Sequence, residues 1–421
     1  MTTLVILFLV NVLNFYDRLT LGAIAVPLRR EFHLSDAQIG GLSTGFTVLY
    51  AIAGWPLGRM ADTKSRKGLL VWGVAVWSAL TALGGLASSY GMLLATRLGV
   101  GIGEAVCAPA ATSWIGDAVK PERRTRAMAW FMMAVPVGLM LSFSLGSAIS
   151  QARGWRVALA LAALPAIALI PALLSLREPL RTSVVATNVS PRALTSIPAF
   201  WWIAVSGAIL NFALYSLSVF FPTFLTRYHH LSVAQAGIWA GIGLGISGIV
   251  GALFAGFIGD RATGNLGRAR MRLAAVASFC AAPLAFAGIA TPGGAAALAI
   301  GLIVAANAFF QMYYGLVYAA MHDIVPPNLR GSAMGAYFAV QYLGGAAWGP
   351  LLTGRLSDHF AHAATASGAA ADAASAIGLH QAMYVIPALA LALGVVLWAG
   401  AAAAQERPPE SRNRNLAVTT L

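Results

Sequence analysis

Residues 37–88 consist of AQIGGLSTGFTVLYAIAGWPLG (37–58), RMADTKSRK (59–67) and GLLVWGVAVWSALTALGGLAS (68–88). Two apolar stretches are thus separated by nine residues, of which four are basic. A helix needs about 20 mainly apolar residues to cross a bilayer. We therefore expect these 52 residues to form two membrane-spanning helices joined by a charged turn.

The same alternation continues along the chain. The 421 residues are 59% hydrophobic and only 10% charged, whereas soluble domains are about 25% charged. Proline residues Pro136 and Pro350 are expected to bend the fifth and eleventh helices, and the Ala/Ser-rich segment 361–377 is expected to be a mobile external loop. The pattern predicts an all-α membrane protein with twelve transmembrane helices, at 4–27, 37–58, 68–88, 92–116, 127–150, 156–176, 200–226, 234–258, 272–290, 294–321, 332–354 and 380–403.

Basic residues are concentrated in every second connecting segment. If both termini are cytoplasmic, 19 of the 27 lysine and arginine residues fall on the cytoplasmic side and 6 on the other, as the positive-inside rule requires. This asymmetry accounts for the net charge of +13 without a nucleic-acid partner. The excess of arginine over lysine and the abundant alanine favour a GC-rich bacterial source, and hence the inner membrane.

The two halves of the chain repeat one another at a nearly constant offset. Asn14 matches Asn211 at an offset of 197 residues, and Asp117 matches Asp323 at an offset of 206. Repeated six-helix halves with a site between them are typical of secondary transporters. We predict two pseudo-symmetric six-helix bundles joined by a cytoplasmic loop, with the N-terminal bundle at 1–176, the loop at 177–198 and the C-terminal bundle and tail at 199–421.

One connecting segment resembles a known signature. GRMADTKSRK at 58–67 resembles the signature between the second and third helices of the major facilitator superfamily, except that Ser65 stands where a glycine is usual. GFIGDR at 256–261 resembles its degenerate second copy. The resemblance covers nearly the whole chain and implies the fold of that superfamily (MFS), with transport by alternating access.

Within that superfamily the chain resembles the spinster family. The similar segments are NFYDR at 14–18, RLGVGIGEA at 97–105, RTR at 124–126 and AVPVG at 134–138. This resemblance implies proton-linked transport of lysophospholipids or sphingoid phosphates. Similar first- and fourth-helix motifs also occur in transporters of small organic anions. The alternative is therefore a proton-coupled organic-anion symporter, or a drug-efflux antiporter on the same scaffold.

Four ionisable residues lie well inside predicted helices, namely Asp17, Arg18, Arg97 and Glu104. A charge at the bilayer centre costs at least about 2.5 kcal/mol and usually faces a cavity or a partner. Arg97 and Glu104 share one helix face, about 10 Å apart along the axis. We predict that Asp17 carries the coupling proton and exchanges partners with Arg97 or Arg18, while Glu104 joins that network or responds to substrate. The alternative is a static ion-pair network between the first and fourth helices.

The second half carries uncharged polar and aromatic stripes at helical spacing instead. The stripes consist of Asn211, Tyr215 and Ser218 on the seventh helix, Asn307, Gln311, Tyr314 and Tyr318 on the tenth, and Tyr337, Gln341 and Trp348 on the eleventh. With Asn14 of the first helix, they are predicted to line a substrate cavity that is charged on one side and aromatic on the other, which suits an amphiphile. The alternative for each residue is packing between helices.

A further cluster lies at the predicted cytoplasmic helix ends and consists of Gly58, Asp62, Arg66 and Asp117. The family resemblance implies that such a cluster holds the helices together while the cavity faces outward, so we predict a cytoplasmic gate here. The alternative for each basic residue is a simple topology signal.

The sequence offers no catalytic or metal-binding constellation, and its two cysteines lie far apart in apolar stretches. We therefore expect no enzymatic activity, no metal, and no cofactor other than the coupling proton. The expected partners are membrane lipids and an amphiphilic or anionic small molecule, with no nucleic acid and with the protein as a monomer.

Overall fold

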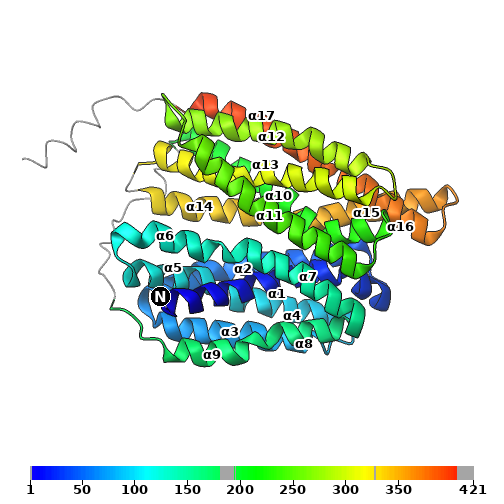
Figure 1. The fold of residues 1–421 in the computed structure, drawn as a ribbon, viewed down its shortest axis with the longest axis horizontal. Coiled ribbons are helices and arrows are strands. Elements are labelled where there is room, and N and C mark those ends of the chain that lie inside the picture. The colour runs from blue at the N-terminus through cyan, green and yellow to red at the C-terminus, as the bar shows by residue number, and fades with distance from the viewer. Residues whose placement is uncertain (1, 181–193, 195, 327–328, 405–421) are drawn as a thin grey trace, which may run out of the picture.

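The computed structural model describes residues 2–180, 194, 196–326 and 329–404, and the regular structure in these ranges is helical throughout. Figure 1 shows two groups of nearly parallel helices, one from the first half of the chain and one from the second. The predicted all-α fold with twelve crossings is confirmed. Most of the connecting segment predicted at 177–198 lies outside the described residues.

Seven crossings are single helices, namely α1 (Thr2–Phe32), α2 (Asp36–Thr63), α3 (Arg66–Gly84), α10 (Pro198–Arg227), α11 (Val233–Gly259), α12 (Leu266–Ala290) and α13 (Ala296–Ile324). The other five crossings are divided. Four consist of two helices each: α4 (Tyr90–Glu104) with α5 (Cys107–Ala118), α6 (Pro121–Met132) with α7 (Ala134–Arg153), α8 (Trp155–Ala163) with α9 (Pro165–Ser175), and α16 (Ala371–Met383) with α17 (Val385–Ala403). The fifth consists of α14 (Arg330–Gln341), the π-helix η3 (Tyr342–Ala346) and α15 (Gly349–Ala366). We call α1–α9 the first bundle and α10–α17 the second bundle.

Ten of these crossings are apolar and long enough to span a membrane by composition alone. The other two are α2, which is rich in glycine, serine and threonine, and the crossing that η3 interrupts.

Each divided crossing is interrupted within the few residues before a proline. A proline lacks the backbone N–H, and its ring clashes with the carbonyl group four residues earlier, so it weakens an α-helix there, although α1, α2, α10 and α12 continue through an internal proline. The prolines concerned are Pro109, Pro136, Pro165, Pro350 and Pro387. The bends expected at Pro136 and Pro350 are confirmed, and the break before Pro109 ends α4 at Glu104.

The segment 361–377, predicted to be a mobile external loop, is mostly helical. Helix α15 continues to Ala366 and α16 begins at Ala371, so the prediction was wrong. Alanine is the best helix former, and the composition that suggested a loop extends the helices instead. Helices α15 and α16 pack against each other as a hairpin, at the end of the molecule opposite the N-terminus (Figure 1).

The two bundles are joined more closely at one end than at the other. We call the end where α1 begins and α17 ends the terminal end, and the opposite one the distal end. The bundles pack together mainly through α2 with α15 and α7 with α11. Near the distal end, Gly40 lies so close to Pro350, and Gly237 to Ser147, that a Cβ at either glycine would collide with its neighbour.

The buried apolar residues show the same asymmetry. The core of the second bundle is continuous with distal residues of the first bundle, such as Leu28 and Phe143. Terminal residues of the first bundle, such as Leu7 and Trp114, belong to a separate cluster. The hydrophobic core therefore joins the two bundles through their distal halves.

Candidate functional site

The distal ends of the bundles meet at a buried carboxylate. Asp36, the first residue of α2, accepts hydrogen bonds from both terminal nitrogens of Arg227, at 2.7 and 2.8 Å, and from the Ser357 hydroxyl at 2.6 Å. The Asp358 carboxylate accepts from the backbone N–H groups of Asp36 and Ala37, where a helix N-terminus favours negative charge. We call Asp36, Arg227, Ser357 and Asp358 the distal joint. Sequence reasoning missed it because its hydrogen bonds join the two bundles, although Arg29 Nε of α1 also lies 3.5 Å from Asp36 Oδ1.

Nearer the middle of the first bundle, Arg18 of α1 pairs with Glu104 at the end of α4. The Arg18 Nε lies 3.2 Å from Glu104 Oε2, and the two side chains are 4% and 0% exposed. Arg18 also donates a hydrogen bond of 3.3 Å to Asn14 Oδ1. The structure thus brings together three of the predicted residues, and Arg18 pairs with Glu104 rather than with Asp17.

Aromatic rings surround the Arg18 guanidinium. Its carbon lies 4.2 Å from the centre of the Tyr50 ring, 4.7 Å from that of Phe15 and 5.4 Å from that of Phe46. The Tyr50 ring contacts Tyr342 of η3, which in turn contacts Tyr215 of α10. Since cation–π attraction is strongest where water is excluded, these rings hold the guanidinium at the boundary between the bundles.

Of these aromatic residues, only Tyr215 was predicted. Tyr342 was missed because the π-helix changes the number of residues per turn and so shifts the phase of the eleventh crossing. For the same reason Trp348, predicted for the cavity from regular α-helical spacing, lies beyond η3 and is 46% exposed. Prolines marked where a break could occur, but several helices continue through a proline, and the sequence did not indicate that this break would be a π-helix.

Asp17 lies beside this pair and is fully buried. Neither carboxylate oxygen has a regular hydrogen-bond partner among the described residues. Arg97 contacts the backbone of Asp17 rather than its carboxylate: Arg97 Nη1 donates a hydrogen bond of 3.4 Å to the Asp17 carbonyl oxygen. The predicted ion pair between Asp17 and Arg97 or Arg18 is therefore not formed in this conformation.

Small residues of α4 allow this arrangement. At Gly101 a Cβ would collide with the backbone of α2 at Phe46, and at Gly103 it would press on Trp77 of α3. The close approach of these helices leaves no room for larger residues. As a result Glu104 and Arg97 project from a helix that is held tightly on two sides.

In the second bundle, five of the predicted cavity residues contact one another. Tyr314 donates a 3.4 Å hydrogen bond to Asn211, and Asn211 donates one of 3.2 Å to Gln341. The Tyr318 ring meets the Tyr337 ring edge-on at 5.6 Å. This cluster joins α10, α13 and α14.

Two further stripe residues lie elsewhere. Asn307 donates a 2.8 Å hydrogen bond to Ser247 of α11, and Gln311 packs beside Gly251 of the same helix. Both residues therefore pack between α13 and α11, which is the alternative to lining the substrate cavity.

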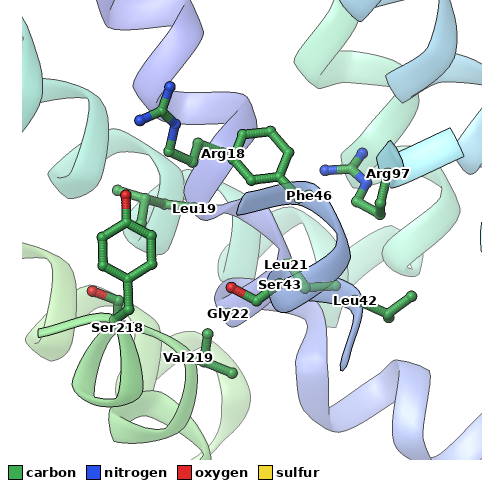
Figure 2. Close-up of a pocket in the computed structure, with 11 residues that line it drawn as sticks. Arg18, Leu19, Leu21, Gly22, Leu42, Ser43, Phe46, Arg97, Ser218 and Val219 are labelled. Carbon is green, nitrogen blue, oxygen red and sulfur yellow. The ribbon is translucent and has the colours of Figure 1, made fainter. Parts of the chain in front are cut away.

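A small cavity of about 20 Å³ lies between the bundles, enough for a single water molecule. Figure 2 shows Arg18 and Arg97 on two sides of Phe46, with Ser218 and Val219 of the second bundle across the cavity. The lining residues are Arg18, Leu19, Leu21, Gly22, Leu42, Ser43, Phe46, Arg97, Tyr215, Ser218 and Val219.

At the terminal end, Arg66 joins several elements of the first bundle. Its Nη1 donates to Asp117 at 2.5 Å and its Nε to Glu178 at 3.2 Å, although Arg66 is only 1% exposed. Of the predicted gate residues, Gly58 faces Pro109 of α5, where an added Cβ would lie 4.0 Å from the Pro109 Cβ, and the side chain of Asp62 lies outside what the structure describes.

The sequence analysis did not predict that Glu178 would belong to this cluster, because it lies just after the last apolar stretch of the first half. Partial burial alone would raise its pKa, but hydrogen bonds from Ser65 and from the backbone N–H groups of Arg66 and Lys67 hold that pKa below its usual value. The second bundle contains a similar pair, between Arg270 and Asp323 at 2.6 Å. Asp323 is the repeat partner of Asp117, so the internal repeat extends to this ion pair.

Comparison with known proteins places this architecture in a family. Residues 7–350 match the model of the Major Facilitator Superfamily. An MFS-type efflux pump of Mycolicibacterium smegmatis is 29% identical over 84% of this chain and 83% of its own. Protein spinster homolog 1 of Xenopus tropicalis is 27% identical over 85% and 73%.

Among solved structures, a bacterial homolog of the human lysosomal transporter spinster, in an inward-facing and occupied conformation, superposes with a TM-score of 0.86. It is 26% identical, and the match covers 96% of this chain and 98% of that one. The chain therefore belongs to the Major Facilitator Superfamily, as an integral membrane transporter rather than an enzyme, and resembles the spinster proteins within it.

Proposed function

We propose that this transporter is proton-coupled and moves lipid-like amphiphiles of the lysophospholipid or sphingoid phosphate class by alternating access. The observation that carries the proposal is the buried Asp17 carboxylate, which forms no ion pair with a described residue and lies next to a buried Arg18–Glu104 ion pair. An unpaired charge is costly at this depth, so Asp17 is proposed to be protonated in this conformation.

Loss of that proton supplies the coupling step. An ionised Asp17 would attract Arg18 or Arg97, and Arg18 would then leave Glu104. An anionic headgroup can compete for the same guanidinium, since both are oxygen anions that accept its N–H groups. Proton and substrate thus act on one exchangeable ion pair.

The unequal composition of the two bundles supports an amphiphilic substrate. The ionised groups lie on the first bundle, and the second contributes rings such as Tyr215 and Tyr342. A phosphate head would bind Arg18 while an acyl or sphingoid chain lies along aromatic and aliphatic surface. Spinster homologs are among the similar proteins.

The positive-inside rule supports a cytoplasmic location for the terminal end and for both chain termini. The distal joint would then close the outer side, and the protein would face inward. We propose that it works as a monomer in a bacterial inner membrane, with membrane lipids around it, no nucleic-acid partner, no metal and no cofactor besides the proton.

The test is accumulation of a labelled lysophospholipid or sphingoid phosphate in proteoliposomes, with and without an imposed pH gradient. The proposal predicts gradient-dependent accumulation that Asp17→Asn abolishes. Accumulation that is equal with and without the gradient would contradict proton coupling.

A second candidate is drug efflux in exchange for protons, which the similarity to the mycobacterial efflux pump favours. In the same proteoliposomes, gradient-driven movement of a lipophilic cationic dye without movement of lysophospholipid would select it. Movement of a sugar acid alone would select the organic-anion alternative.

A further inference from the structure

Buried polar atoms without partners recur on three neighbouring helices of the first bundle. Besides both Asp17 oxygens on α1, they include Ser78 Oγ and Thr81 Oγ1 on α3, and Arg97 Nη2 and Glu104 Oε1 on α4. Buried polar groups are nearly always hydrogen-bonded, so such a group of exceptions needs a physical reason. The α3 hydroxyls are not used by the mechanism above.

The packing of α3 on α4 determines where Thr81 lies. The two helices are antiparallel, with Leu80 against Gly99, Gly84 facing the Arg97 guanidinium, and Trp77 against Gly103. Thr81 therefore lies between the levels of Arg97 and Glu104. It is fully buried and lies near the Asp17 carboxylate, although neither group makes a regular hydrogen bond to a described residue in this conformation.

We propose that Thr81 is a positioning residue that sets the pH at which Asp17 exchanges the coupling proton. A hydroxyl both donates and accepts hydrogen bonds. When Asp17 is ionised, the Thr81 O–H donates to the carboxylate. When Asp17 is protonated, its own O–H donates to Thr81 Oγ1. Thr81 therefore hydrogen-bonds Asp17 in both states and shifts the balance between them, while Arg18 or Arg97 still supplies the charge that attracts the ionised carboxylate.

The charges around Asp17 leave room for such control. Arg97 and Glu104 of α4 act on it with opposite signs, and Tyr16 is its titratable neighbour on α1. Because the two charges oppose each other, a nearby hydroxyl that turns toward Asp17 can decide which protonation state is better stabilised.

The test is the pH dependence of transport in proteoliposomes containing the Thr81→Val variant, which keeps the shape and removes the hydroxyl. A hydrogen bond to a charged group is stronger than one to a neutral group, so the variant loses more in the ionised state. The pH of half-maximal proton-driven transport should rise by about one unit. Thr81→Ser, which restores a hydroxyl, should return the profile to that of the wild type.

Ser78→Ala is the matched control, because Ser78 is one turn away on α3, also buried and also without a partner among the described residues. Its profile should stay unchanged. An unshifted Thr81→Val profile, or an equal shift in Ser78→Ala, would overturn the inference. If Thr81→Val does not fold, Thr81→Cys, a weaker donor, should give a smaller shift in the same direction.

This inference rests on the proposed proton coupling, and the two can fail separately. Wild-type transport that does not respond to a pH gradient contradicts the proposed function. A responsive wild type with an unchanged Thr81→Val profile contradicts only the role of Thr81.

Discussion

The distal joint predicts the effect of removing one charge. In Asp36→Asn the amide offers a single acceptor oxygen, so one of the two Arg227 hydrogen bonds is lost together with the charge. Breaking one partner of a buried ion pair costs about 3–5 kcal/mol, and the lower value applies because Arg227 is 11% exposed. The joint stabilises only the distally closed conformation. At 1.4 kcal/mol per factor of ten, the ratio of open to closed molecules should rise about 100-fold.

Labelling of a cysteine in the cavity between the bundles measures this ratio. Ser43→Cys reports from the cavity between the bundles, in a background where Cys107 and Cys280 are replaced by alanine. A membrane-impermeant maleimide added at the distal side should react about 100-fold faster in Asp36→Asn, since opening limits access. Thermal unfolding in detergent confirms that the variant is folded.

Glu31→Gln is the matched control. Glu31 is also a carboxylate near the distal end, but its partners Trp155 and Arg156 belong to the same bundle. Its labelling rate should equal that of the unmodified reporter. Equal rates in Asp36→Asn and the unmodified reporter would refute the assignment of the joint, and a matching increase in Glu31→Gln would attribute the effect to charge alone.

Two further predictions concern the first bundle. Glu178→Gln should lower the free energy of unfolding by about 1 kcal/mol at neutral pH, because the glutamate caps α3. Since its folded pKa is lowered, that contribution is present above the unfolded value of about 4.3 and disappears as the pH falls below it. Thermal unfolding of both proteins between pH 7 and pH 3 should therefore show converging stabilities, and a constant difference would contradict the assignment. Arg18→Lys should raise the KM for an anionic amphiphile about tenfold, because lysine loses the planar contact with Tyr50 and Glu104; an unchanged KM would exclude Arg18 from headgroup binding.

Hydrophobic patterning predicted an all-α membrane protein with twelve crossings, although two of them are less apolar than the rest. The two-bundle arrangement was predicted from the internal repeat, and the family from the segments at 58–67 and 97–105. The extent of α15 and α16 could not be predicted in the same way, because an alanine-rich segment has no strong preference between membrane and water. Its helical state depends on packing between the two helices.

The site was predicted only as a set of residue types. Asp17, Arg18, Arg97 and Glu104 were identified because they lie inside predicted spans, where ionisable side chains are rare and usually functional. The pairing of Arg18 with Glu104 depends on the end of α4 and on the rotation of α1, neither of which residue spacing determines. Tyr342 depends on a π-helix that regular spacing does not anticipate.

The central claim is that substrate and proton movement are coupled through Asp17. Its most direct test is proton movement in proteoliposomes loaded with a pH-sensitive dye, after addition of lysophospholipid without any imposed gradient. The account predicts a substrate-dependent pH change with the wild type and none with Asp17→Asn, while that variant still exchanges labelled for unlabelled substrate. A substrate-dependent pH change of the same size in Asp17→Asn would contradict it.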